Sequence, residues 1–100
     1  MTTTINTTKN YELTILMDEG ATDKDIEEMT KRVKKYGKIT SFEDDGVKRL
    51  AYPIQRERLH EKTRYLFYTM TIEGDNWKEL SNDFNTNENI VRYLLVRAAR

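Results

Sequence analysis

The chain of 100 residues has no cysteine, one proline and four scattered glycines, and its formal net charge is zero. The lack of cysteine excludes a disulfide framework, thiolate catalysis and cysteine-ligated metal sites. The scattered glycines exclude a glycine-rich phosphate-binding loop. A neutral chain does not attract nucleic acid as a whole, so any binding to nucleic acid would need a local basic patch.

Long apolar runs are also missing, and none approaches the roughly 20 residues that a membrane-spanning helix needs. The start of the chain is rich in threonine and lacks the apolar stretch of a signal peptide and the arginines of a transit peptide. We therefore expect a polar tail at residues 1–9 and one domain at residues 10–98, without a membrane segment. The tail is either a mobile extension or a segment that orders on a partner.

Residues with catalytic chemistry are few and badly placed for it. His60 is the only histidine and lies in the charged segment 55–64, which we expect to be a solvated loop. Asp44 and Asp45 precede a glycine and are typical of a turn or bulge. We therefore predict no enzyme activity, no cofactor, no metal site and no small-molecule substrate.

Hydrophobic periodicity predicts four strand regions and two helices. The expected strands cover residues 10–17, 38–54 with a turn or bulge at 44–46, 64–72 and 90–96. The first helix starts with Thr22 or Asp23 as its cap, carries the stripe Ile26, Met29, Val33 and Tyr36, and ends with Gly37 as its C′ glycine. The second helix starts at Asp75 and carries Trp77, Leu80 and Phe84 on one face.

The order β-α-β-β-α-β predicts an α+β fold, the ferredoxin-like split β-α-β sandwich. Right-handed crossovers place both helices on one face of a four-stranded antiparallel sheet. The strand order four-one-three-two makes the second and fourth strands the edges. Pro53 lies on the second strand, where a missing amide donor does least harm.

Alternation along the strands assigns side chains to the two faces of this sheet. The helix-covered face takes Leu13, Ile15, Met17, Leu66, Tyr68, Met70, Ile72, Tyr93 and Leu95. The open face takes Leu16, Tyr65, Phe67, Leu94 and Val96, with Arg49 and Arg92 nearby. An apolar patch of this size is typical of a surface that binds a protein partner, unless the strand register is shifted or the N-terminal tail covers it.

Basic residues on strands and loops beside this face are candidates for phosphate contacts. They are Lys48, Arg49, Arg56, Arg58, Arg92 and Arg97. Lysines and arginines on the first helix are more typical of a solvated helix surface, and arginines paired with neighbouring acids would look the same in the sequence.

The stretch GVKRLAYPI at 46–54 resembles the signature of bacterial small-subunit ribosomal protein six: a glycine, two mostly basic or polar residues, then Leu-Ala-Tyr-Pro-Ile. NYEL at 10–13, YG at 36–37 and ENIVRYLLV at 88–96 resemble the opening strand, the end of the first helix and the last strand of that family. The resemblance covers about residues 10–98.

The resemblance implies a cytoplasmic, ribosome-bound structural protein. Members of the family pair with small-subunit ribosomal protein eighteen and bind the central domain of the small-subunit ribosomal RNA as a heterodimer. Lys48 and Arg49 would then lie at the border between protein partner and RNA, while Leu50, Tyr52 and Ile54 bury their strand.

Two other readings share the topology. An autonomous single-strand RNA reader would stack bases on Tyr65 and Phe67, although the segment lacks the glycines of that motif and Leu16 stands where an aromatic is needed. A regulatory or ligand-binding module would form homo-oligomers through the open face, and light scattering would separate it from a chain that is monomeric without its partner.

Overall fold

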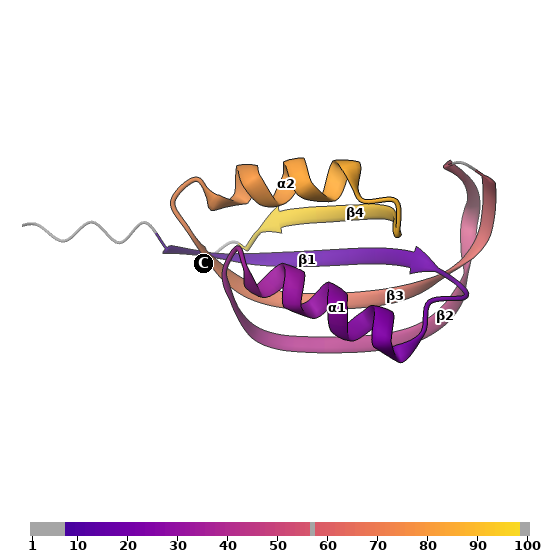
Figure 1. The fold of residues 1–100 in the computed structure, drawn as a ribbon, viewed down its shortest axis with the longest axis horizontal. Coiled ribbons are helices and arrows are strands. Elements are labelled where there is room, and N and C mark those ends of the chain that lie inside the picture. Colours follow the sequence, from indigo (N-terminus) through magenta and orange to yellow (C-terminus); the bar gives the residue numbers. More distant parts are fainter. Residues whose placement is uncertain (1–7, 57, 99–100) are drawn as a thin grey trace, which may run out of the picture.

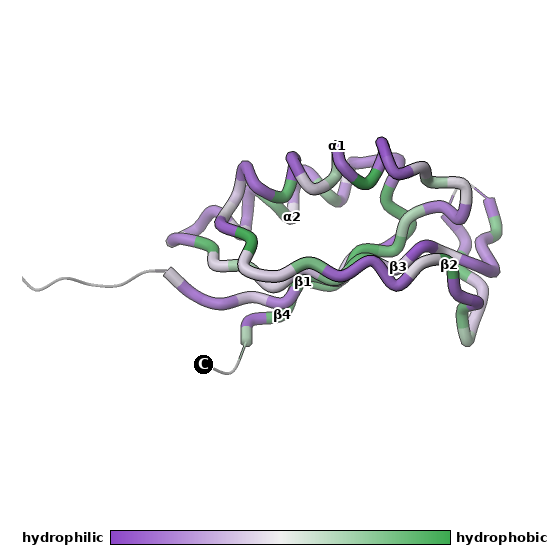
Figure 2. Tube along the Cα trace, turned by 90° about the horizontal axis from the view of Figure 1, so that it is seen from below, coloured by the Kyte–Doolittle hydropathy of each residue, from purple (hydrophilic) through white to green (hydrophobic). Residues whose placement is uncertain are grey.

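The computed structural model describes residues 8–56 and 58–98 (Figure 1). Its elements are β1 (Thr8–Asp18), α1 (Asp23–Lys34), β2 (Lys38–Arg56), β3 (Arg58–Glu73), α2 (Asn76–Thr86) and β4 (Ile90–Arg97). The strands form one antiparallel sheet in the order β2-β3-β1-β4. Both helices lie on one face of it (Figure 2). The ferredoxin-like fold, the strand order and the edge positions of β2 and β4 are therefore confirmed.

The first strand begins slightly earlier than expected. Thr8 and Lys9 belong to β1 and pair with Glu73 and Ile72 of β3. The remainder of the expected tail, residues 1–7, lies outside the described residues.

Helix α1 starts with a capping box at Thr22. The Thr22 hydroxyl accepts a hydrogen bond from the Asp25 amide at 3.2 Å, and the Thr22 amide donates to the Asp25 carboxylate at 2.9 Å. Of the two candidates, Thr22 and Asp23, Thr22 is therefore the N-cap. Ile26, Met29 and Val33 are buried, as their spacing predicts.

Gly37 does not have the role expected of it. The helix is capped at Lys35, and among the described glycines only Gly46 and Gly74 have positive φ. A Cβ on Gly37 would lie 2.1 Å from the Thr71 carbonyl oxygen. This position therefore needs glycine because the chain passes directly against β3, and not because the helix ends in a left-handed residue.

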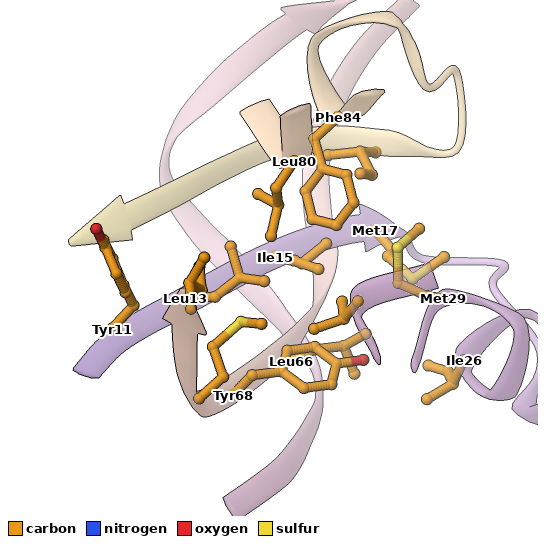
Figure 3. Packing of buried hydrophobic residues seen from close by; sticks show 14 residues of the cluster. Tyr11, Leu13, Ile15, Met17, Ile26, Met29, Leu66, Tyr68, Leu80 and Phe84 are labelled. Atoms are coloured by element: carbon orange, nitrogen blue, oxygen red, sulfur yellow. The ribbon is translucent and has the colours of Figure 1, made fainter. Parts of the chain in front are cut away.

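The core lies between the sheet and the two helices. Leu80 and Phe84 of α2 point down onto β1, and Met29 of α1 lies beside Met17 (Figure 3). The expected inward residues of β1 and β3 are all buried, and Tyr93 and Leu95 of β4 pack partly buried against them. The predicted assignment of the covered face is confirmed.

The two helices also contact each other through polar groups. Arg32 donates to both carboxylate oxygens of Asp83, at 3.1 and 2.9 Å, and the Tyr36 hydroxyl donates to Asp83 at 2.7 Å. These hydrogen bonds, first that of Arg32, hold the pKa of Asp83 below its ordinary value. On α2 itself, Leu80 is buried but Trp77 remains 38% exposed, so the expected apolar face is only partly covered.

The segment 55–64 is not a loop. Strands β2 and β3 continue to Arg56 and Arg58 and form a two-stranded ribbon that rises beyond the sheet (Figure 1). The expected turn or bulge at 44–46 is a bulge within β2: the register shifts between Asp44 and Gly46, Gly46 has φ +77°, and its amide donates to Asp44 at 2.9 Å.

Residues of the ribbon that were expected to bury their strand do not do so. Tyr52 is 83% exposed, and Leu50 and Ile54 are only partly buried. No register partner is recorded for residues 50–53, where β2 shifts against β3 and Pro53 stands at the edge. The ribbon has too few layers around it to bury these side chains.

Arg64 of β3 links the start of the ribbon to the N-terminal end of α1 and to β2 by hydrogen bonds. Its guanidinium donates to the Ala21 carbonyl at 3.0 Å and to Asp23 at 3.1 Å, and it forms two hydrogen bonds with Asp44. The hydrogen bond from Arg64 holds the pKa of Asp44 below its ordinary value. This arginine was not among the candidate functional residues, because its acids are distant in sequence.

Candidate functional site

The open face of the sheet carries an apolar patch that we call the open-face patch. It consists of Leu16, Tyr65, Phe67, Leu94 and Val96, the residues that alternate with core residues on β1, β3 and β4. Leu94 is 61% and Val96 44% exposed, and the other members are half-buried. No described helix lies on this side of the sheet (Figure 2).

The register of the strands makes this patch continuous. Leu16 is the pairing partner of Tyr65 on β3 and of Arg92 on β4, and Thr14 is the partner of Phe67 and Leu94. Side chains of such directly paired residues are neighbours on one face. The rings of Tyr65 and Phe67 lie 6.2 Å apart between centroids. Five apolar side chains from three strands therefore form one surface.

Cations stand at two borders of the open-face patch. Lys48 Nζ lies 5.8 Å from the centroid of the Tyr65 ring, within the range of a cation–π contact, and 3.0 Å from Asp45. Arg92 is exposed on β4 and pairs with Leu16, so it lies at the opposite border of the open-face patch from Lys48. An apolar centre with basic flanks suits a protein partner in the middle and phosphates at the rim.

Arg49 lies on the opposite side of the ribbon from the open-face patch. It pairs with Lys62, which shares a face with Arg64, and Arg64 contacts α1 on the helix side. Lys48, one residue earlier, faces Tyr65. The expectation that Arg49 belongs to the partner face is therefore not met, because successive strand residues point to opposite faces.

Arg49 instead forms a pair of like charges with Lys62. The two are exposed and directly opposite each other, and neither has an ion pair among residues 8–56 and 58–98. Like charges in this position repel, and an anion between them would remove the repulsion. Lys62 was not among the candidate RNA-binding residues, and its position opposite Arg49 depends on the pairing of the two ribbon strands.

Arg56 and Arg58 hold the ribbon tip against the domain. The Arg56 guanidinium donates to the carbonyl oxygens of Asn85 at 3.2 Å and Asn87 at 3.4 Å, and Arg58 pairs with Asp18. These two cations were predicted to bind RNA, but their guanidinium groups already have partners within the chain.

Arg97 lies at the end of β4 opposite Tyr11, at the other end of the strand from Ile90. It is exposed and lines a shallow groove with Trp77 and Tyr93. The six predicted RNA-binding residues therefore occupy several places: Lys48 and Arg92 flank the open-face patch, and the others lie elsewhere.

His60, expected in a solvated loop, is only 7% exposed. Its Nε2 lies 3.1 Å from the Arg56 carbonyl oxygen. No group of three or more histidine, cysteine, aspartate or glutamate residues is placed to hold a metal ion in the part of the chain that the structure describes. No helix within that part is long and apolar enough to cross a membrane.

The comparisons with known proteins agree with the geometry. The family described as Ribosomal protein S6 matches residues 10–97. The chain belongs to the ribosomal protein S6 family. A crystal structure of the 30S ribosomal protein S6 from Thermotoga maritima superposes with a TM-score of 0.77 at 25% identity, covering 91% of this chain and 88% of that one.

Relatives of this S6-family chain have two kinds of name. The small ribosomal subunit protein bS6 of Chlamydia muridarum is 28% identical over 89% of this chain and 78% of the relative. That of Buchnera aphidicola is 33% identical over 92% of this chain and 64% of the relative. The chloroplastic protein Regulator of fatty acid composition 3 of Arabidopsis thaliana is 28% identical over 89% of this chain but only 29% of its own length. A segment similar in sequence to this chain thus also forms part of a longer protein.

Proposed function

We propose that the chain is a structural component of the small ribosomal subunit that binds the central domain of small-subunit ribosomal RNA together with ribosomal protein eighteen. Family membership and the names of the bacterial relatives support the ribosomal role. In this proposal the protein is cytoplasmic and ribosome-bound, and it has no catalytic task.

The observation that carries the proposal is the open-face patch with Lys48 and Arg92 at its borders. Leu94 and Val96 leave exposed apolar surface that a protein partner would remove from water. The chain has no net charge, and RNA affinity depends mainly on neutralising phosphates, so the chain alone would bind RNA weakly. A basic partner on the patch would complete the RNA-binding surface.

A matched pair of variants tests the protein interface. Leu94→Asp places a charge in the open-face patch, and Leu59→Asp makes the same change at a ribbon residue of similar exposure, 52% against 61%. In a pull-down with purified ribosomal protein eighteen, Leu94→Asp should lose binding and Leu59→Asp should keep it. Equal retention by both variants would remove the open-face patch from the interface.

The RNA contact is tested with the assembled heterodimer and a central-domain RNA fragment over a range of salt concentrations. Replacing Lys48 and Arg49 by alanine should weaken binding and lower the slope of log affinity against log salt by at most about two units. The control replaces the exposed Lys34, the last residue of α1, and Lys35, its C-cap, by alanine. A slope that changes only in the control would place the RNA at the C-terminal end of α1 and away from the ribbon.

A further inference from the structure

A cavity of about 390 Å³ lies where four segments meet: the end of β1, the start of α1, the connection from α2 to β4, and the ribbon tip. His60, Asp18 and Arg58 line it from the ribbon and β1, and Glu88 and Asn89 from the connection. None of the residues of the open-face patch takes part. The protein-partner surface of the proposed function is therefore separate from this cavity.

His60 has an unused hydrogen-bonding atom here. Its Nε2 lies 3.1 Å from the Arg56 carbonyl oxygen, which can only accept, so the proton of a neutral ring is on Nε2. Nδ1 then presents a lone pair, 3.5 Å from Asp18 Oδ1, and has no hydrogen-bond partner although the side chain is only 8% exposed. A buried acceptor without a donor is costly, and here it adjoins a carboxylate.

The arginines of the cavity are already engaged. Arg56 donates to the carbonyl oxygens of Asn85 and Asn87, and Arg58 pairs with Asp18. They form walls of the cavity; Asp18 compensates the charge of Arg58, whereas Arg56 contacts neutral carbonyl groups. An anion entering here would have to compete with these existing contacts.

The carboxylates of the cavity and His60 Nδ1 are hydrogen-bond acceptors, so the group that fits them is a hydrogen-bond donor. Asp25 uses one carboxylate oxygen for the Thr22 amide. Glu88 is exposed at the lining, and no ion pair is recorded for it among the described residues. With Asp18, three carboxylates face two guanidiniums, so a neutral His60 leaves the lining with an excess of negative charge and of acceptors.

We propose that this cavity binds a cationic hydrogen-bond donor, a guanidinium or a primary ammonium group. A guanidinium presents several N–H groups in one plane and can donate to two neighbouring acceptors at once. His60 Nδ1 and Asp18 Oδ1, 3.5 Å apart, form such a pair. Asp18 Oδ1 already accepts from Arg58, so the ligand would share this oxygen with Arg58, and Glu88 at the same lining supplies further negative charge. The group comes either from an arginine or lysine side chain of a protein that docks at the ribbon tip or from a free polyamine.

The test is an NMR titration of the whole chain, followed through the backbone amides of Gly20 and Asn89 at the cavity. The probes are N-acetyl-arginine methylamide, its lysine counterpart, spermidine, and the uncharged N-acetyl-citrulline methylamide. Saturable shifts are expected with a cationic probe and none with citrulline. Absence of saturable shifts with every cation, or equal shifts with citrulline, would overturn the proposal.

Variants of Glu88 and His60 show whether the cationic probe binds in this cavity and which nitrogen of His60 takes part. Glu88→Gln should weaken it about tenfold, since a charge-assisted contact is lost, and the exposed Glu79→Gln on α2 should leave it unchanged. His60→Gln keeps a donor for the Arg56 carbonyl but removes the Nδ1 acceptor, while His60→Asn keeps an acceptor near Nδ1. Affinity should fall with glutamine and be largely retained with asparagine.

The probes also distinguish the source of the cation. Preference for the arginine or lysine analogue supports a side chain of a docking protein, and preference for spermidine supports a free polyamine. Binding that is unaffected by both Glu88→Gln and His60→Gln would contradict the assigned site. Leu94→Asp, which tests the proposed function, should leave the titration unchanged, so the two proposals can fail separately.

Discussion

The two faces of the sheet carry similar kinds of side chain and differ in what lies over them. On β3, Leu66, Tyr68 and Met70 point toward the helices and are 0–1% exposed. Tyr65 and Phe67, between them, point the other way and are half-buried, with no helix above them. Apolar composition alone therefore does not show which face forms the core of the isolated chain.

This difference separates the residues that stabilise the fold from the residues that are available to bind a partner. Residues of the covered face are enclosed on all sides, so their loss leaves a cavity. Residues of the open-face patch keep contact with water, and their burial awaits a partner. Substitutions on the first face should act on folding, and those on the second on binding.

The largest effect is expected from two leucines on opposite faces of the sheet. Leu66→Ala removes a fully buried side chain and should lower the free energy of unfolding by about 2–5 kcal/mol. Leu94→Ala, at 61% exposure, should lower it by less than about 1 kcal/mol. Urea unfolding at neutral pH measures both, and similar losses would mean that the two faces do not differ in the way described.

A smaller loss of stability is expected from a change at Gly37, where the chain passes close to β3. Gly37→Ala would place a Cβ 2.1 Å from the Thr71 carbonyl oxygen and 2.9 Å from the end of Met70. The required shift of backbone should destabilise the fold by about 1–3 kcal/mol. Gly20→Ala is the control, because its nearest atom is a side-chain oxygen of Asp18 at 3.1 Å, which can move. Thermal unfolding of both variants would show whether the glycine at 37 is required for packing.

Alternation predicted the sheet well because it is a local property of each strand. It assigned Leu66 and Tyr68 to the core and Phe67 to the open side, and the predicted strand order placed Pro53 on an edge strand. The reason for Gly37 is not local, since it depends on Thr71 of another strand. The C′ role expected for it follows from helix chemistry alone and was therefore wrong.

The candidate site was predicted less completely for the same reason. The polar segment 55–64 has the composition of a loop, but its arginines reach carbonyl oxygens at 85 and 87 and the carboxylate of Asp18. Such partners cannot be read from neighbouring residues. The apolar members of the open-face patch and the neighbouring Arg92 were predictable from period two, whereas the separation of Lys48 from Arg49 depended on the register of the ribbon.

The contact between the helices that cover the core should depend on pH. Arg32 and Tyr36 lower the pKa of Asp83 in the folded state, so folding stabilises its ionised form. This stability is present above the ordinary aspartate pKa and is lost as the pH falls through the lower native value, below about pH 4. Arg32 is partly exposed, so the contribution should be less than about 1 kcal/mol.

Asp83→Asn tests this contact by urea unfolding at pH 7 and pH 3. The variant should be less stable than the parent at pH 7, and the difference should be smaller at pH 3, because the unfolded parent then binds a proton at Asp83 more readily than the folded parent, whose Asp83 pKa is lowered. A difference that stays constant between the two pH values would show that packing, and not the charge of Asp83, links the helices.

The smallest effect on stability is expected at the ribbon, where the like charges of Arg49 and Lys62 face each other in the isolated chain. Lys62→Glu replaces the repulsion with Arg49 by attraction and should raise the free energy of unfolding by about 0.2–1 kcal/mol. Lys38→Glu is the control, since its partner Thr71 is uncharged. If the cation pair serves to hold RNA phosphate, the more stable Lys62→Glu protein should bind RNA less well in the heterodimer. A gain in stability without loss of RNA affinity would mean that the like charges at 49 and 62 are a surface feature with no part in binding.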